Sequence, residues 1–253
     1  MESGIISKSL AAIRKEPHET SEMVNQMIFG ETFDIVENYK GWLRIISHFD
    51  QYHGWLDSRL SSIISENRSS NFRIASTLFK AKEDNSEFPI NLCPGTVLTD
   101  YIDGTFSCGN SKLHQLDNPF EDFSGNQADT IVQMAKRYIN SPYLWGGRSP
   151  YGIDCSGLVQ VVYRIADISL PRDASQQATA GSTVEFIDHV KTGDLAFFDN
   201  EEGAITHVGI ISNKEQIIHS SGFVRVDKFD HQGIFNVNTK QYSHKLRVIK
   251  RVF

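Results

Sequence analysis

The stretch Asp154-Cys155-Ser156-Gly157 lies where a glycine-rich segment gives way to a helical pattern. Downstream of it, apolar residues recur at helix-like intervals, at Leu158, Val159, Val161, Val162 and Ile165. Asp154 suits the N-cap position because its carboxylate accepts hydrogen bonds from the free amides of the first turn. Cys155 then falls in that turn, where the helix dipole and unpaired amides favour the thiolate, the nucleophilic form. Taken alone, Cys155 is more often a small buried core residue, so the rest of the chain has to decide.

Two histidines stand on segments that the sequence pattern marks as strands. His207 lies in Ile205–Ile211 and His219 in Gln216–Ser220, and a turn signal separates the two runs at 212–215. A three-residue loop centred in that turn would pair the two histidines directly on one face, with Cβ atoms about 5 Å apart. A two-residue turn would instead place the two rings on opposite faces of the sheet.

Such a histidine pair beside a cysteine suits nucleophilic catalysis. His207 would take the proton of Cys155, and His219 would hold the His207 ring in one tautomer and orientation. Taken singly, each histidine is more often an ordinary strand residue. A zinc site built from the same three side chains is a further alternative, but their spacing lacks the closely spaced ligand pairs typical of metal sites. We therefore expect neither a metal nor an organic cofactor.

Six short motifs follow one another along the second half of the chain. They are Tyr143-Leu144-Trp145-Gly146-Gly147, Asp154-Cys155-Ser156-Gly157, Leu170-Pro171-Arg172-Asp173-Ala174-Ser175-Gln176-Gln177, Gly193-Asp194-Leu195-Ala196-Phe197-Phe198, Thr206-His207-Val208-Gly209-Ile210 and Ile218-His219. In this order they resemble the NlpC-type cysteine peptidases, papain-like enzymes that cut cell-wall peptides, over residues 124–253. The resemblance implies Cys155 as nucleophile, His207 as base and His219 as the third polar residue. It also implies an α+β papain-like catalytic domain, in which a helix bearing the cysteine packs on an antiparallel sheet.

The periodicity of this half agrees with that fold class. An amphipathic helix should end near Asn140, ahead of Pro142, and its apolar positions are Ile131, Met134, Ala135 and Tyr138. Strand-like runs follow at Leu195–Phe198, Ile205–Ile211, Gln216–Ser220, Phe223–Val226 and Leu246–Phe253. Runs of helix followed by runs of strand favour an α+β domain.

Further residues are candidates for the cleft. The oxyanion of a tetrahedral intermediate needs hydrogen-bond donors, and the backbone N–H of Cys155 and the hydroxyl of Tyr143 are candidates. Tyr143 is alternatively an ordinary loop aromatic. Ser175 is expected to line or brace the cleft together with Arg172 and Asp173, although Arg172 is alternatively a surface ion pair.

The first half of the chain reads as β-rich. Short runs at Phe33–Val36, Trp42–Ile46 and Gly54–Leu56 are separated by turn residues, and their pattern resembles a bacterial SH3-like barrel. We predict an SH3-like barrel at 1–66 that shapes the substrate cleft, a second, degenerate SH3-like barrel at 67–123, and the catalytic domain at 124–253. An irregular β-rich linker domain is the alternative for the second barrel. Polar linkers are expected at 67–71 and 118–126.

Composition excludes several function classes. Of the 253 residues, 40% are hydrophobic and 22% charged, and the net charge is −6 with no basic stripe, so we expect no nucleic acid and no membrane partner. The segment from Met1 to Ala12 lacks the charged and apolar regions of a signal peptide. We expect a cytoplasmic enzyme, or a secreted one if a signal was removed. Cys93 and Cys108 are expected to be reduced structural cysteines.

Two barrels ahead of such a domain resemble the YkfC-type γ-D-glutamyl-L-diamino-acid endopeptidases (dipeptidyl-peptidase VI), which recycle murein peptides. The resemblance implies that the first barrel closes one end of the cleft and that the enzyme accepts short peptides with a free N-terminal L-Ala. Asp154, before the nucleophile, and Tyr52, in the barrel, match residues that hold the substrate amine. Ser156 matches the residue after the nucleophile and is a further candidate for substrate binding. Glu22 is our choice for the barrel carboxylate, with Glu16 and Glu19 as alternatives. An ammonium group taken out of water needs such a counter-charge and acceptors.

The expected partner is a short murein-derived peptide, without an obligate protein partner. The diamino acid is either meso-diaminopimelate or lysine. Three other functions remain open: a secreted peptidoglycan endopeptidase acting on intact wall, a non-catalytic wall-binding protein, and a thiol acyltransferase or amidase.

Overall fold

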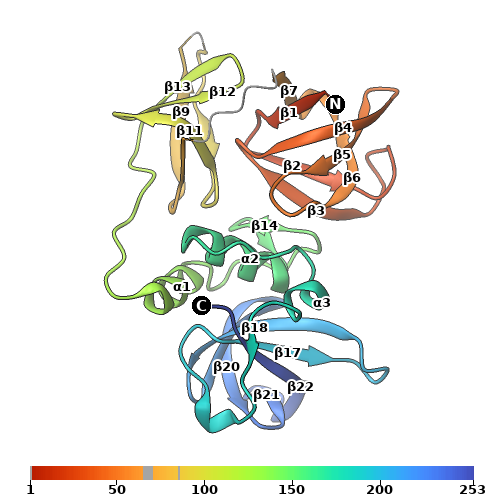
Figure 1. The fold of residues 1–253 in the computed structure, drawn as a ribbon, viewed down its shortest axis with the longest axis vertical. Coiled ribbons are helices and arrows are strands. Elements are labelled where there is room, and N and C mark those ends of the chain that lie inside the picture. The colour runs from red at the N-terminus through yellow and green to blue at the C-terminus, as the bar shows by residue number, and fades with distance from the viewer. Residues whose placement is uncertain (1, 65–70, 85) are drawn as a thin grey trace. The chain divides into compact units, whose positions relative to one another are not determined.

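The computed structural model describes residues 2–64, 71–84 and 86–253, which fall into two compact units, Met1–Asp122 and Phe123–Phe253 (Figure 1). The predicted boundary between the two barrels, at 66/67, lies outside the described residues. So does the predicted linker at 67–71, except for its last residue. The predicted linker at 118–126 contains the division between the two units.

The first unit begins with an antiparallel sheet. Within the described ranges, seven strands form it, in the order β3-β2-β6-β5-β4-β1-β7. Their bounds are β1 (Ser3–Ile6), β2 (Leu10–Arg14), β3 (Met23–Ile28), β4 (Thr32–Tyr39), β5 (Trp42–Ser47), β6 (His53–Asp57) and β7 (Ser61–Ile64), with the short helix η1 (Ser58–Leu60) before β7. Lys40 and Gly41 form the two-residue turn between β4 and β5, and both have positive φ, as a tight hairpin of this kind requires. The runs predicted at Phe33–Val36, Trp42–Ile46 and Gly54–Leu56 are therefore confirmed as strands.

A second antiparallel sheet follows in the same unit. Among the described residues it has six strands, in the order β10-β9-β13-β12-β11-β8. They are β8 (Phe72–Ile74), β9 (Phe79–Glu83), β10 (Ile90–Leu92), β11 (Val97–Ile102), β12 (Thr105–Cys108) and β13 (Ser111–Gln115).

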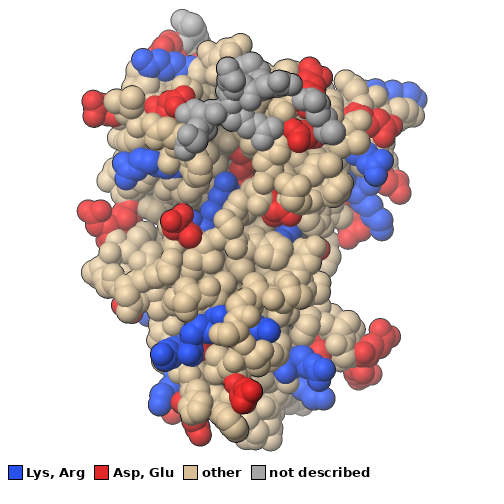
Figure 2. All heavy atoms as spheres, in the orientation of Figure 1, with Lys and Arg blue, Asp and Glu red and all other residues tan. Residues whose placement is uncertain are grey.

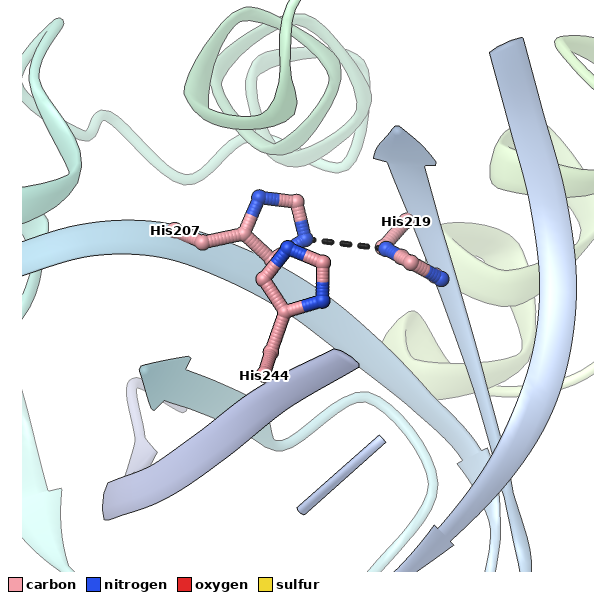
Figure 3. A group of neighbouring side chains, drawn as sticks. All are labelled: His207, His219 and His244. Carbon is pink, nitrogen blue, oxygen red and sulfur yellow. Dashed lines mark hydrogen bonds between the residues drawn. The ribbon is translucent and has the colours of Figure 1, made fainter. Parts of the chain in front are cut away.

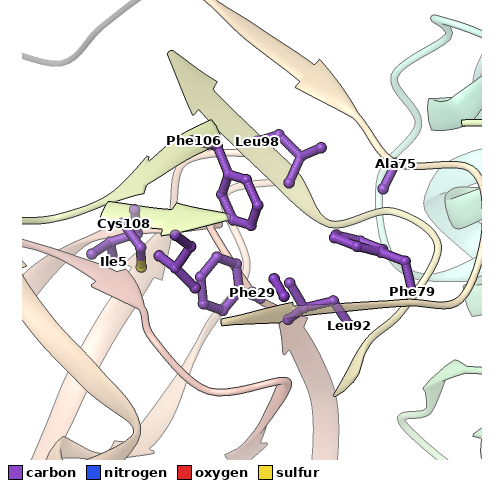
Figure 4. Packing of buried hydrophobic residues seen from close by; sticks show 10 residues of the cluster. Ile5, Phe29, Ala75, Phe79, Leu92, Leu98, Phe106 and Cys108 are labelled. Atoms are coloured by element: carbon purple, nitrogen blue, oxygen red, sulfur yellow. The ribbon is translucent and has the colours of Figure 1, made fainter. Parts of the chain in front are cut away.

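The two sheets of the first unit share one apolar cluster (Figure 4). Ile5 lies on β1 and Phe29 directly follows β3, and both pack among residues of the second sheet. The ring of Phe106 meets Phe29 edge-on at 6.1 Å and Phe79 at 6.4 Å. Each sheet therefore depends on the other to cover part of its apolar face. Cys93 and Cys108 are buried and free, as expected.

The second unit begins with helices. They are α1 (Gln127–Arg137), α2 (Cys155–Ile165), α3 (Ala174–Gln177) and the short η2 (Ile187–His189). Asn126 is the N-cap of α1 and forms a capping box with Asp129, and the helix ends at its C-cap, Tyr138. The predicted end of this helix near Asn140 is thus confirmed to within a turn.

The largest sheet of the second unit closes on itself. Its order in the described chain is β16-β22-β17-β18-β19-β20-β21, and β21 also pairs with β22. The strands are β16 (Ser182–Thr183), β17 (Leu195–Asp199), β18 (Ile205–Asn213), β19 (Gln216–Ser221), β20 (Phe223–Asp230), β21 (Gly233–Asn236) and β22 (Gln241–Arg251), beside a separate small hairpin of β14 (Arg148–Ser149) and β15 (Gly152–Ile153). Closure depends on the length of β22, because its first part pairs with β21 and its last part with β17.

An apolar cluster is shared by the strands of the closed sheet. Its buried members are Val190, Ala196, Phe198, Ile211, Ile217, Phe229, Ile234 and Ile249. Helix α2 packs against β18 and β19, so the predicted arrangement of a cysteine-bearing helix on an antiparallel sheet is confirmed. Two predicted strands were too short: β20 continues past Val226, and β22 begins before Leu246. Strand β21 was not predicted.

Charged side chains are mixed in sign on the face shown in Figure 2, where Lys and Arg alternate with Asp and Glu. None of the described helices is both long enough and apolar enough to cross a membrane.

The shared cluster of the first unit gives a stability prediction. Phe106 is 1% exposed, so Phe106→Ala should destabilise that unit by about 3–5 kcal/mol, through lost burial and the cavity left behind. Urea denaturation measures the change. Phe88→Ala is the control, because Phe88 is 74% exposed and its loss should cost less than about 0.5 kcal/mol. Equal midpoints for the two variants would contradict the shared core.

Candidate active site

The start of α2 holds Cys155 in a fixed position. Asp154 is the N-cap, and its Oδ1 accepts a hydrogen bond from the N–H of Gly157 at 2.7 Å, as predicted. A Cβ at position 157 would lie 2.3 Å from the carbonyl oxygen of Gly147, so only glycine lets the preceding loop pack against the first helical turn. Cys155 is the first residue of the helix and is 7% exposed.

The carboxylate of Asp154 also forms a buried ion pair with Arg172. One guanidinium nitrogen donates to Oδ1 at 3.0 Å and the other to Oδ2, while the N–H of Gly146 donates to Oδ2 at 2.8 Å. The same guanidinium donates to Ser156 Oγ at 2.8 Å. Arg172 is 1% exposed, which rules out the alternative of a surface ion pair. This ion pair holds the first turn of α2, which carries Cys155, in place.

The predicted register of the histidine hairpin is wrong, although the two rings do meet. His219 pairs with Gly209 rather than with His207, and the turn has two residues, between Asn213 and Gln216. A register shift between Ile211 and Asn213 adds one residue to β18, which restores the parity that a two-residue turn would otherwise have reversed. The rings therefore stay on one face, as diagonal neighbours.

Gly209 makes room for this diagonal contact. A Cβ there would lie 2.6 Å from Ile217 and 3.1 Å from the Cβ of His219. With no side chain directly opposite His219, the ring of His207 reaches across, and its Nε2 lies 2.9 Å from His219 Nδ1 (Figure 3).

A buried carboxylate continues this chain of hydrogen bonds. His219 Nε2 lies 3.0 Å from Asp227 Oδ2, and Arg225 donates to the other oxygen of Asp227 at 2.8 Å. Burial raises the pKa of Asp227, but the hydrogen bonds from His219 and Arg225 outweigh burial and hold the pKa below its usual value. Asp227 is therefore an acceptor at neutral pH.

The carboxylate fixes the proton on every ring of the chain. Because Asp227 accepts, His219 carries its proton on Nε2 and offers the lone pair of Nδ1. His207 must then donate through Nε2, which leaves the lone pair on its Nδ1 as the available base. We assign this nitrogen to the thiol of Cys155, which receives a hydrogen bond from the amide of Val208, the residue after His207.

The resting nucleophile and base are both neutral. Burial raises the pKa of the Cys155 thiol to about 12, the nearby Asp154 charge adds to the shift, and the amides of Val208 and Ser156 lower it only in part. The expectation that the helix start alone favours a thiolate is therefore wrong, because burial outweighs the helix amides. Burial also lowers the pKa of His207 well below 6.5, with His244 and His219 adding to the shift. This pair must exchange its proton as the thiol attacks.

A third histidine belongs to the cluster and was missed in the sequence. The ring of His244, on β22, stacks on His207 with centroids 4.1 Å apart and planes 23° apart. Burial lowers the pKa of His244 to about 4, so this ring is also neutral at physiological pH. One nitrogen from each of the three rings lies within 4.8 Å of the others.

Both missed residues, Asp227 and His244, left a signal in the alternation of their strands. Asp227 occupies a buried position of β20 two residues before the buried Phe229, where a charged residue is unusual. Extending the alternation of Leu246 backward by two residues reaches His244.

The remaining predicted residues fall in both units. Tyr143 is half-buried in the loop before α2, where burial, followed by the nearby Cys155 and Asp154, raises its pKa to about 12. Its hydroxyl therefore stays protonated and able to donate. Ser175 lies on α3 and is exposed. Glu22 and Tyr52 belong to the first unit, where Lys15 Nζ lies 3.8 Å from Glu22 Oε2. Their contact with substrate stays a prediction.

Comparisons with known proteins relate both halves of the chain to known families. The NlpC/P60 family model matches residues 140–247, and the model of the bacterial dipeptidyl-peptidase SH3 domain matches residues 13–59. The chain is 31% identical over 214 residues to the gamma-D-glutamyl-L-lysine dipeptidyl-peptidase of Bacillus subtilis, covering 77% of this chain and 71% of that protein. It is 26% identical to dipeptidyl-peptidase 6 of Lysinibacillus sphaericus, covering 90% and 92% of the two chains. The crystal structure of an NlpC/P60 family protein from Bacillus cereus shares the fold, with a TM-score of 0.82 at 18% identity over 99% of both chains.

The proton arrangement predicts a positioning role for Asp227. In Asp227→Asn the amide can donate to His219 Nε2, which reverses the tautomer of both rings and places a proton on Nδ1 of His207, the nitrogen that we assign as the base. Alkylation of Cys155 by iodoacetamide at pH 7 should slow by about 10-fold to 100-fold. Mass spectrometry of the Cys155 peptide measures the rate, with the buried Cys93 as an internal reference.

Asp230→Asn is the matched control, since Asp230 lies on the same strand but its carboxylate bonds to Tyr242. It should alkylate at the wild-type rate. Equal rates in Asp227→Asn and Asp230→Asn, with equal melting temperatures, would show that Asp227 does not position the base.

The lowered pKa of His207 predicts that Cys155 keeps its reactivity in mildly acidic solution. A base with its pKa below 6.5 stays unprotonated as the pH falls through 6.5, so the rate of Cys155 alkylation should decline only below that pH. The rate is measured at constant ionic strength from pH 8 to pH 4 (on the order of half-unit steps). A decline centred at or above pH 6.5 would contradict the neutral, buried base.

Proposed function

The chain belongs to the NlpC/P60 family of cysteine peptidases, and from this premise we propose that it hydrolyses the γ-D-glutamyl–diamino-acid bond of short murein peptides that carry a free N-terminal L-Ala. The observation that carries this proposal is the joint match of both units. The relative from Bacillus subtilis, named a gamma-D-glutamyl-L-lysine dipeptidyl-peptidase, aligns over 77% of the chain. The SH3 domain of bacterial dipeptidyl-peptidases matches the first unit separately.

The acylation step uses the residues that α2 and the closed sheet bring together. The sulfur of Cys155 attacks the γ-carbonyl carbon of D-Glu while its proton passes to Nδ1 of His207. The imidazolium that forms is stabilised through Nε2 by His219, and by the negative charge of Asp227 beyond it. The oxyanion accepts from the backbone N–H of Cys155 and from the hydroxyl of Tyr143.

Collapse of the tetrahedral intermediate breaks the bond to the diamino acid. His207 gives its proton to the leaving amine and returns to the neutral state. A water molecule then loses a proton to His207 and attacks the thioester, which releases L-Ala-D-Glu and restores the thiol of Cys155. The neutral resting pair suits both steps, because the same nitrogen accepts and returns one proton in each.

Selection of short peptides is assigned to a clamp on the free amine. An ammonium group needs a counter-charge and acceptors when it leaves water. Glu22 and Tyr52 from the first unit, with Asp154 and Ser156 at the nucleophile, would supply them. The two oxygens of Asp154 already accept from Arg172 and from two backbone amides, so we assign the main counter-charge to the barrel carboxylate.

A peptidase of this specificity would act after the wall has been broken down, on peptides that are no longer attached to glycan. We therefore place the enzyme in murein peptide recycling, in the cytoplasm. The nature of the diamino acid is part of the test.

The test compares two forms of one peptide. L-Ala-γ-D-Glu-diamino-acid tripeptides, with lysine or meso-diaminopimelate, are offered with the α-amine free or acetylated, and products are followed by mass spectrometry. We expect L-Ala-D-Glu from the free-amine form and at least a 100-fold lower rate (an order-of-magnitude figure) from the acetylated form, because the acetyl group removes the charge that the clamp binds.

Cys155→Ala should abolish turnover, and Cys93→Ala is the control for loss of a buried thiol away from the site. Glu22→Gln, compared with Glu16→Gln and Glu19→Gln, identifies the carboxylate. Equal cleavage of free and acetylated peptides would remove the clamp and favour an enzyme acting on intact wall, which release of soluble fragments from sacculi would then confirm. Cleavage of neither peptide would mean that the cysteine acts on a different substrate.

A further inference from the structure

The three histidines of the site lie close together, which catalysis alone does not require. One nitrogen from each of His207, His219 and His244 lies within 4.8 Å of the other two, and His207 Nε2 lies 2.9 Å from His219 Nδ1. In Figure 3 the facing nitrogens of His207 and His219 are joined by the drawn hydrogen bond, and the ring of His244 lies against that of His207. A base and its orienting partner need only the bond between His207 and His219. His244 adds a third imidazole, carried to the same place by β22.

The outer nitrogen of His219 has the partner that a metal-binding imidazole usually has. It is held by Asp227 at 3.0 Å, which leaves the Nδ1 lone pair directed into the cluster. A carboxylate behind a ligating histidine is a regular feature of zinc sites, because it fixes the tautomer and makes the ligand more basic.

His244 is oriented in a similar way. Its Nδ1 lies 2.9 Å from Ser243 Oγ, and the hydroxyl of Ser243 itself donates to the carbonyl of Ile234 at 3.3 Å. With its proton committed to Ile234, the hydroxyl oxygen accepts from Nδ1 of His244. The lone pair of His244 is then on Nε2, free to bind a ligand in the cluster.

We propose that His207, His219 and His244 bind a zinc ion that switches the peptidase off. Zinc takes imidazole nitrogens at about 2.0–2.1 Å in tetrahedral geometry, and three histidines with one open position is a common set. A small rotation of the His207 and His219 rings, which now point at each other, opens the space for the ion. Cys155 does not belong to this group of ligand atoms.

Inhibition follows from moving one proton within the ring of His207, with no proton gained or lost by the protein. In the active form His207 carries its proton on Nε2 and its lone pair on Nδ1. Zinc needs the lone pair of Nε2, so the proton moves to Nδ1. The nitrogen facing the thiol is then a donor, and the base that Cys155 requires is lost. His219 and His244 bind through lone pairs that they already present.

Binding is tested separately from turnover, because the inhibition rests on the proposed function whereas the binding does not. Isothermal titration of Cys155→Ala with zinc chloride measures affinity and stoichiometry with the reactive thiol removed. Substitution by Co²⁺ reports the ligand geometry through its visible absorption. We expect one ion per chain and the strong absorption of tetrahedral cobalt.

His244→Gln in the same background should weaken zinc binding by on the order of tenfold or more, since one ligand of three is lost. His231→Gln is the matched control, because His231 is an exposed histidine of the turn before β21. Asp227→Asn gives a second variant, which should weaken binding through the tautomer of His219. Equal affinities in His244→Gln and His231→Gln, or no binding by Cys155→Ala, would overturn the site.

The inhibitory role is read on the thiol rather than on a peptide. Zinc should slow alkylation of Cys155 in the wild-type chain, and a chelator should restore the rate. In His244→Gln the same zinc concentration should have a much smaller effect. Zinc that slows both proteins equally would point to direct binding by the thiol and would overturn the switch. A wrong choice of peptide substrate changes neither the titration nor the alkylation.

Discussion

The hydrogen bond between His219 and Asp227 determines what the rest of the site can do. A buried carboxylate with two donors stays charged, so it can only accept. That single constraint fixes the proton of His219 and then that of His207, so the free lone pair of His207 is on Nδ1. The chemistry of the proposed reaction therefore depends on a residue that touches neither the substrate nor the thiol. The fold supports it by placing Asp227 on β20, next to the strand that carries His219.

The nucleophile is positioned by a second buried charge pair, between Asp154 and Arg172. Burying two charges costs much of what their attraction returns, so such a pair contributes little net stability. Its value here is geometric. The carboxylate joins the helix start, the preceding loop and the segment before α3 through five hydrogen bonds. Cys155 is consequently held at the N-terminus of α2, which packs against the sheet that carries the base.

Local patterns in the sequence predict much of this arrangement. The N-cap at Asp154, the helix after it and the strands of both histidines follow from spacing and residue type. The register of the hairpin does not, because one extra residue in β18 reverses the parity of every position beyond it. His244 was missed for a related reason. Its strand begins five residues before the predicted run at Leu246, in a polar stretch that becomes a strand only because β21 is there to pair with it.

Closure of the sheet thus has a chemical consequence. The first part of β22 would be a free edge in an open sheet, and it carries His244. Pairing with β21 brings that strand around to the face that holds His207, where the two rings stack. The same imidazole that catalysis uses as a base then lies within reach of a metal, and the two uses differ only in which nitrogen of His207 carries the proton. A site that sets tautomers through buried hydrogen bonds is sensitive to any ligand that prefers the other tautomer.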